Sequence, residues 1–181
     1  MMKRLTRDAV ALLFLEMMIL QGVHEMEHIV QVVQRGWLGI ANGAGMLGSV
    51  FDVEPVHMVY NLLFLFLIAA VYAGCRRDRR AIPANPDRVM RLLQVSFVFQ
   101  IWHTTEHVVK MYQYFQTGLN GTPGILGYWF PVVYLHFWYN TLLYIPIVIA
   151  FFVGGFHVAS WRVLSHGLRG RRRSTRSQLA S

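Results

Sequence analysis

The sequence is poor in charge and almost without cysteine. Only 14% of its 181 residues are charged, whereas 55% are hydrophobic, and the mean hydropathy is +0.38. This composition excludes an ordinary soluble domain and indicates a membrane protein. The single cysteine, Cys75, excludes a disulfide framework within the chain and any zinc or iron–sulfur site built from several of its cysteines. A metal site made by this chain would therefore depend on its eight histidines.

Acidic residues are also scarce, with 9 against 17 Lys and Arg, and the formal net charge is +8. Fifteen of the cations precede the first apolar stretch, separate the second from the third, or follow the fourth; the other two are Arg35 and Lys110. In a four-span protein those fifteen share one side of the membrane, so the positive-inside rule predicts that both termini are cytoplasmic. This segregation argues against a nucleic-acid partner and predicts contact of the basic tail with anionic lipid.

Four apolar stretches are each long enough to cross the ~30 Å hydrocarbon core of a bilayer. All four are expected to be helical, because an isolated segment in lipid can satisfy its backbone hydrogen bonds in no other way. The expected spans are residues 9–34, 55–75, 88–113 and 130–156. The sequence therefore predicts an all-α, multi-pass integral membrane protein of the plasma or inner membrane.

An internal repeat relates the two halves of the chain. Residues 24–61 align without a gap on residues 103–140, an offset of 79, and 14 of the 38 aligned positions are identical. This predicts a four-helix bundle formed by tandem duplication of a two-helix hairpin. Both copies would have the same orientation, related by a pseudo-twofold axis along the membrane normal. The predicted units are the first repeat (1–80), the second repeat (81–160) and a basic cytoplasmic tail (161–181).

Each copy carries two motifs, H-x-x-E-H in its first helix and H-x-x-Y-N in its second. Residues three and four apart share one face of a helix, and both motifs lie toward the outer membrane face, where they can meet. Neutral imidazoles with a carboxylate suit Zn, Fe or Cu. We therefore expect a pseudo-symmetric His/Glu metal centre, in its fullest form with two metal ions. Its candidate ligands are His24, Glu27, His28 and His57 in the first copy and His103, Glu106, His107 and His136 in the second.

Amide and phenol groups accompany these motifs at matched positions. Groups of this kind orient metal-bound imidazoles through hydrogen bonds in many metal sites. We expect this supporting role for Gln21, Tyr60 and Asn61 and for their equivalents Gln100, Tyr139 and Asn140.

The motifs resemble those of two families of metalloenzymes, in each case over the motif alone. The H-x-x-E-H pattern of residues 24–28 and 103–107 is similar to the zinc motif of the inverzincin peptidases, which implies metal-assisted hydrolysis. The H-x-x-x-H spacing is also similar to the first histidine box of membrane di-iron desaturases and hydroxylases, although the H-x-x-H-H boxes of that family are missing. A redox enzyme, a hydrolytic enzyme and a metal-handling protein are all compatible with the motifs.

Two further functions are compatible with the sequence. In a b-type haem electron-transfer subunit, histidines from facing helices would bind haem b axially; a pair at i, i+4 cannot supply both axial ligands, so several histidines would be left over. In a non-catalytic scaffold subunit, the polar stripe would contact other chains of a membrane complex or homo-oligomer.

Overall fold

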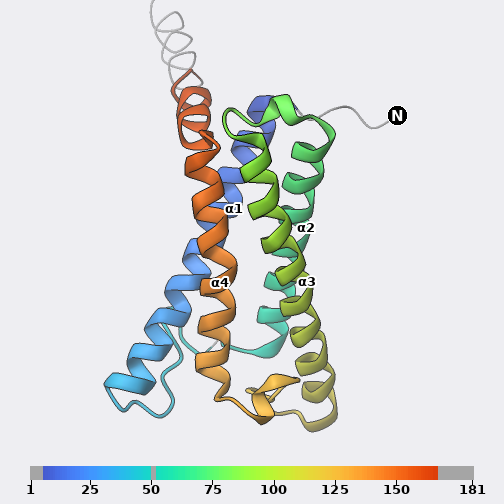
Figure 1. Ribbon diagram of the computed structural model, residues 1–181. Helices are drawn as coiled ribbons and strands as arrows, with labels where there is room; N and C mark the ends of the chain where they lie inside the picture. The colour runs from blue at the N-terminus through green and yellow to red at the C-terminus, as the bar shows by residue number, and fades with distance from the viewer. Residues whose placement is uncertain (1–5, 50–51, 167–181) are drawn as a thin grey trace, which may run out of the picture.

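The computed structural model describes residues 6–49 and 52–166. Four long helices dominate this part of the chain and pack side by side as an up-and-down bundle (Figure 1). They are α1 (Arg7–Val32), α2 (Glu54–Arg77), α3 (Pro86–Thr117) and α4 (Val132–Val153). The described residues contain no strand, so the expected all-helical class is confirmed. The basic stretch of the tail after residue 166, including Arg169–Arg173, and the cations Lys3 and Arg4 lie outside the described residues.

The helix ends follow local signals in the sequence. At the start of α1, the Thr6 hydroxyl accepts a hydrogen bond from the Ala9 N–H at 3.2 Å. Pro86 occupies the first turn of α3, where its missing N–H is not needed, and Gly118 ends that helix with a φ of 69°. A π-helical turn, Val33–Trp37, extends α1. The four helices cover the segments that the hydropathy pattern predicts, with shifts of only a few residues.

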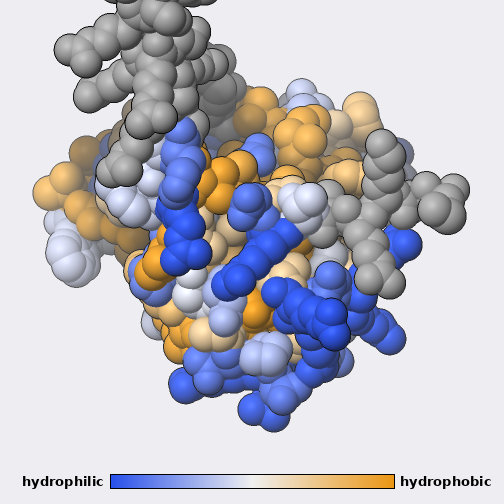
Figure 2. Space-filling model, turned by 90° about the horizontal axis from the view of Figure 1, so that it is seen from above, coloured by the Kyte–Doolittle hydropathy of each residue, from blue (hydrophilic) through white to orange (hydrophobic). Residues whose placement is uncertain are grey.

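Both described ends of the chain lie at one end of the bundle, together with the connection between α2 and α3 (Figure 1). We call this the arginine end. A helical segment over residues 156–166 follows α4 and projects from it. Seen from this side, the surface carries many hydrophilic side chains (Figure 2). The exposed arginines of the α2–α3 connection and its flanks are Arg76, Arg77, Arg79, Arg80, Arg88 and Arg91. The connections α1–α2 and α3–α4 lie at the opposite end, the loop end.

Three helices are long and apolar enough to cross a membrane: α2, α4, and α1 with its π-helical turn. They agree with the membrane class that the composition indicates. The fourth expected span lies within α3, which has 32 residues but is not among these three. The reason is its polar stretch, which begins at Gln100 and includes His103, Glu106, His107 and Lys110, all of them buried.

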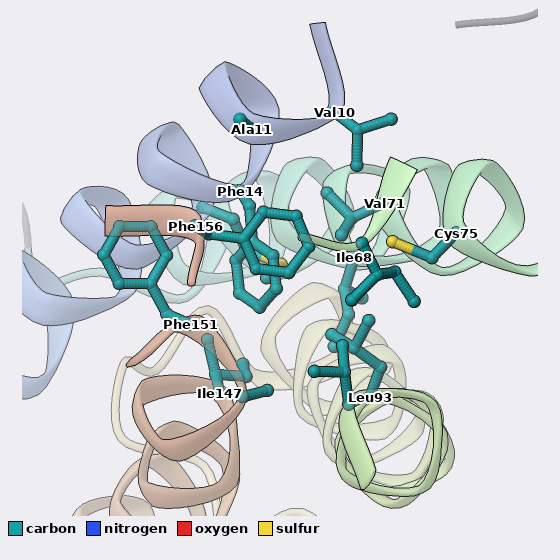
Figure 3. Close-up of a cluster of buried hydrophobic side chains, with 14 of the residues drawn as sticks. Val10, Ala11, Phe14, Ile68, Val71, Cys75, Leu93, Ile147, Phe151 and Phe156 are labelled. Carbon is teal, nitrogen blue, oxygen red and sulfur yellow. The ribbon is translucent and has the colours of Figure 1, made fainter. Parts of the chain in front are cut away.

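The interior of the bundle has an apolar half and a polar half. Near the arginine end, aliphatic and aromatic side chains from all four helices form the core, with Phe14 and Phe156 in ring contact at 4.5 Å between centroids (Figure 3). Toward the loop end, the buried side chains are polar, whereas exposed positions such as Val23 and Leu63 are apolar. A polar interior beneath an apolar surface suits a protein surrounded by lipid, and it brings the motif residues together.

Candidate metal centre

Six histidines from all four helices meet in the polar half of the bundle. We call them the histidine cluster: His24 and His28 from α1, His57 from α2, His103 and His107 from α3, and His136 from α4. All are at most 8% exposed. The centroids of neighbouring rings are 4.6–6.2 Å apart. The structure thus brings together the histidines of both motifs, within each copy and between the two copies.

Two pairs within the cluster have the same internal geometry. His24 and His28 stand one helical turn apart on α1, so their rings share a face, and their Nε2 atoms are 3.2 Å apart. His103 and His107 repeat this on α3, again with 3.2 Å between the Nε2 atoms. Between the copies, the rings of His57 and His107 are stacked at 5.9 Å. Each pair therefore directs two ring nitrogens at one point.

The tautomer of His28 follows from its hydrogen-bond partners. The Gln31 Nε2 amide donates to Asp52 Oδ1 at 3.0 Å, which turns Gln31 Oε1 toward His28 Nδ1 at 2.9 Å. Because a carbonyl oxygen only accepts, His28 Nδ1 carries the proton. In neutral His28 the lone pair then lies on Nε2 and faces His24 Nε2. This lone pair can be bound either by a proton on His24 Nε2 or by a cation between the two rings.

The second pair lacks such an orienting partner. The position equivalent to Gln31 is Lys110, which turns to Glu54 instead, with 2.9 Å between Nζ and Oε1. His103 Nδ1, His107 Nδ1 and His136 Nε2 are buried and make no hydrogen bond. Buried polar atoms without a partner are costly, so these three nitrogens are the candidates for binding a further donor or a cation.

The two motif carboxylates bind the loops at the loop end. Glu27 Oε2 accepts hydrogen bonds from the N–H groups of Met46 and Leu47 at 2.8 and 3.0 Å. Glu106 Oε1 does the same at Ile125 and Leu126, at 2.8 and 3.1 Å. The second oxygen of each carboxylate, Glu27 Oε1 and Glu106 Oε2, is buried without a partner. Each carboxylate thus fixes a loop with one oxygen and keeps the other for a further donor or a cation.

The supporting amides connect the helices of one copy to those of the other. Gln21 Nε2 on α1 donates to Asn140 Oδ1 on α4 at 2.8 Å. Gln100 Nε2 on α3 donates to Asn61 Oδ1 on α2 at 3.1 Å. The remaining N–H groups of Asn61 and Asn140 bond the backbone oxygens of the histidines four residues earlier, both at 2.9 Å. These amides therefore position the helices that carry the histidines.

The two tyrosines lie against the histidine pairs. The Tyr60 ring is stacked on His24 with 4.1 Å between centroids, and the Tyr60 hydroxyl donates to the Leu20 oxygen at 2.6 Å. Tyr139 lies 5.2 Å from His103 between ring centroids and accepts a hydrogen bond from Trp102 at 3.3 Å. Both tyrosines thus restrict the orientation of the neighbouring imidazole by ring contact.

A polar cavity of about 240 Å³ leads toward the cluster from the loop end. Its lining includes Gln31, Asp52 and Lys110 together with His57 and His136 of the cluster. Because α2 and α4 begin at the loop end, a hydrated ion or water molecule has a polar route to these two histidines. The sequence predicts the histidine cluster. It does not predict the Lys110–Glu54 salt bridge or the Gln31–Asp52 hydrogen bond beside the cluster, because these four residues are not conserved between the two copies of the repeat.

The side chains as they stand do not form a finished coordination sphere. Within residues 6–49 and 52–166, no group of three or more His, Cys, Asp or Glu side chains is arranged to hold a metal ion. Each histidine pair supplies two nitrogens 3.2 Å apart, and the rings of His57 and His136 lie beside the pairs. Comparison with family models, curated proteins and solved structures gives no match for this chain.

Proposed function

We propose that this chain is a multi-pass membrane protein that binds a transition metal, Zn, Fe or Cu, at the histidine cluster. The observation that carries the proposal is the repeated pair of Nε2 atoms 3.2 Å apart, on α1 and again on α3. Two nitrogens bound to one ion at 2.0–2.1 Å, with an angle of 90–110° between them, are about 2.8–3.4 Å apart. The spacing of each pair matches that requirement.

The donor set also fits a metal. His24 and His28 would hold one ion and His103 and His107 a second, with His57 and His136 next to both pairs. Glu27 and Glu106, each with one carboxylate oxygen buried without a partner, would be the carboxylate ligands from the same motifs. A metal would take up lone pairs that otherwise stay buried without a donor. When bound, it would supply Lewis-acid or redox chemistry, as in hydrolytic or redox metalloenzymes.

The duplication and the fourth span belong to this proposal. Hydrogen bonds recur at the offset of 79: Gln34 and Gln113 each bind one glycine of the loop through both N–H and C=O, at 2.7–3.1 Å. A twofold axis between the copies would turn the Gln21–Asn140 hydrogen bond into the Gln100–Asn61 hydrogen bond. These matches support two equivalent hairpins in one orientation.

A bilayer position for α3 is supported by its outward face. Its polar side chains between Ser96 and Lys110 are buried apart from Thr105, whereas the other exposed residues of this stretch are Val98, Ile101, Trp102 and Val108. The hydroxyl of Thr105 donates to the Ile101 oxygen at 2.8 Å, so it needs no water. With four spans and the arginine end in the cytoplasm, both termini are cytoplasmic, in the plasma or inner membrane. The loop end then faces outward, and the basic tail lies against anionic lipid.

Metal analysis of the purified protein tests the proposal. The full chain, purified in detergent, is incubated separately with Zn²⁺, Fe²⁺ and Cu⁺, desalted and subjected to elemental analysis and absorption spectroscopy. We expect at least one of these metals at a stoichiometric level, without a Soret band. Replacing His24 and His103 together by alanine breaks both pairs and is expected to lower the metal content to the background level.

His157→Ala is the matched control, because His157 is exposed and lies outside the cluster. It is expected to retain the full metal content. Circular dichroism and gel filtration show whether each variant keeps the helical fold. Unchanged metal content in the folded double variant would refute the assignment. A Soret band would instead establish the haem alternative. A protein that contains neither metal nor haem would leave the scaffold alternative.

A further inference from the structure

One face of α1 is turned away from the other helices of the bundle. Between residues 9 and 30 its exposed side chains are Glu16, Ile19, Val23 and Met26, whereas Phe14 on the opposite side belongs to the core (Figure 3). The exposed positions follow one another at intervals of three, four and three residues. This alternation is the spacing at which one helix packs along another. We call these four residues the α1 seam.

Glu16 places a charged group within a membrane-spanning helix. With its π-helical turn, α1 is long and apolar enough to cross a membrane. Glu16 lies nine positions after Arg7, which is about 13 Å along the helix axis and near the middle of a ~30 Å hydrocarbon core entered at Arg7. Its side chain is shorter than those of Lys and Arg, which can reach back to the membrane surface. The Glu16 carboxylate is therefore held at a depth where lipid offers it no hydrogen-bond donor.

The part of the chain that the structure describes supplies no partner for Glu16 either. Its carboxylate makes no hydrogen bond and no ion pair with any of these residues. A carboxylate left in this way among acyl chains is costly, and ionisable groups within membrane spans usually pair with another group. Glu16 thus requires a donor from outside the described residues.

A groove of about 390 Å³ lies beside Glu16 on the surface of α1. It is lined by Leu12, Leu15, Glu16, Ile19, Leu20 and Val23. Apart from Glu16 the lining is aliphatic, so the groove offers apolar contact to the side chains of a facing helix and one acidic group at a defined depth. Transmembrane helices associate through this combination of close packing and a polar contact between them.

The second copy of the repeat lacks the acidic group. The residue 79 positions after Glu16 is Val95, and the one after Ile19 is Val98. Both valines are 60% exposed on the surface of α3. A valine therefore suffices at this place in the hairpin, and the bundle itself does not require the carboxylate of Glu16. Its reason is to be sought in a contact that only the first copy makes.

We propose that the α1 seam binds a transmembrane helix of another membrane protein that carries an arginine or lysine near the middle of its span. The cation pairs with the Glu16 carboxylate, and the apolar side chains beside it fill the groove. A single polar position in such a seam also fixes the register of the two helices. A second molecule of this chain fits less well, because a symmetric contact would set two Glu16 carboxylates against each other. The proposal rests on α1 lying in a bilayer and does not depend on a metal at the histidine cluster.

The test is association of the full chain with synthetic transmembrane peptides in phosphatidylcholine vesicles that contain EDTA. Energy transfer from a dye at the C-terminus of the chain to a dye on the peptide reports binding. The peptides consist of about 20 leucine and alanine residues with a central arginine, leucine or glutamate. Circular dichroism in oriented bilayers verifies that each spans the membrane, and lysine replaces an arginine that prevents this. We expect the cationic peptide to bind about tenfold more tightly than the leucine peptide, a preference that Glu16→Val should abolish.

Two further variants separate the seam from a general effect on the fold. Ile19→Trp and Val98→Trp place the same indole at matched positions of the two copies, which are 59% and 60% exposed. Only Ile19→Trp should weaken binding of the cationic peptide, severalfold, because it fills the groove. Glu16→Lys should reverse the preference and favour the glutamate peptide, a result that misfolding cannot produce.

Equal binding of the cationic and leucine peptides, or a preference that Glu16→Val retains, would overturn the proposal. The same measurement between two labelled molecules of the chain, without peptide, addresses the other occupant. Energy transfer between them that Glu16→Val abolishes would assign the seam to a second molecule of this chain and overturn the proposal as well. Because EDTA is present throughout, failure of the metal assignment would leave these results unchanged.

Discussion

Replacement of Lys110 by methionine is expected to lower the free energy of unfolding by about 3–5 kcal/mol, the usual cost of removing one partner from a buried ion pair. The Lys110 and Glu54 side chains are only 1% and 6% exposed, and their charged groups are 2.9 Å apart. Lys110 Nζ also donates to the Thr122 oxygen, so it connects α3 both to the start of α2 and to the following loop. Without the ammonium group, Glu54 keeps a buried carboxylate whose Oε2 already has no partner.

The measurement is thermal or denaturant unfolding of the detergent-solubilised protein. A double variant, Lys110→Met with Glu54→Leu, removes both charges and should recover most of the lost stability, since a buried pair can often be replaced by apolar residues at little cost. Arg35→Met is the comparison: Arg35 and Asp52 are 3.4 Å apart with side chains 34% and 25% exposed. This solvated pair should contribute less than about 1 kcal/mol. A double variant as unstable as Lys110→Met would contradict the argument.

The polar stripe of α1 shows which part of the site can be predicted from the sequence alone. Helical spacing places Gln21, His24, His28 and Gln31 on one face, and all four are buried in the structure, whereas Val23 is exposed. The prediction succeeds because the pattern depends only on the 3.6-residue period of the helix. The same reasoning applied to α3 accounts for its polar residues turning inward. Hydropathy, in contrast, gives only a weak indication that α3 spans the membrane. Its buried polar side chains lower the mean hydropathy of the helix although they do not contact lipid.

Contacts between the copies are beyond such reasoning. The repeat aligns Gln21 with Gln100 and Asn61 with Asn140, but it does not indicate that each glutamine binds the asparagine of the other copy. That pairing depends on how the helices are rotated and which neighbours they have. The Lys110–Glu54 pair is still less predictable, because the corresponding positions in the other copy are Gln31 and Val133. The alignment of the two copies therefore gives no reason to pair Lys110 with Glu54, yet both residues line the polar cavity.

Gly124→Ala is expected to destabilise the protein by about 2–5 kcal/mol, through two separate terms. Gly124 has a φ of +71°, a conformation that costs an alanine about 1–2 kcal/mol. A Cβ atom there would also overlap Glu106 Oε1, the atom that accepts from the Ile125 and Leu126 N–H groups, and would lie 2.8 Å from Lys110 Cγ. The carboxylate would have to withdraw and lose these donors while it remains buried, which adds about 1–3 kcal/mol.

Gly118→Ala separates the two terms. Gly118 has a similar φ of +69°, but a Cβ atom there would have no neighbour within 4 Å, so only the backbone term of about 1–2 kcal/mol applies. The first copy offers a parallel comparison. A Cβ at Gly45, where φ is +80°, would overlap Glu27 Oε1 and displace the carboxylate whose Oε2 binds the Met46 and Leu47 N–H groups, whereas Gly39 has φ +65° and open space. If the carboxylates hold the loops, Gly45→Ala and Gly124→Ala will lose similar amounts of unfolding free energy. Both losses will be clearly larger than those of Gly39→Ala and Gly118→Ala. Four equal losses would mean that the backbone conformation alone is responsible, and Glu27 and Glu106 would then contribute little to the loops that close the loop end over the histidine cluster.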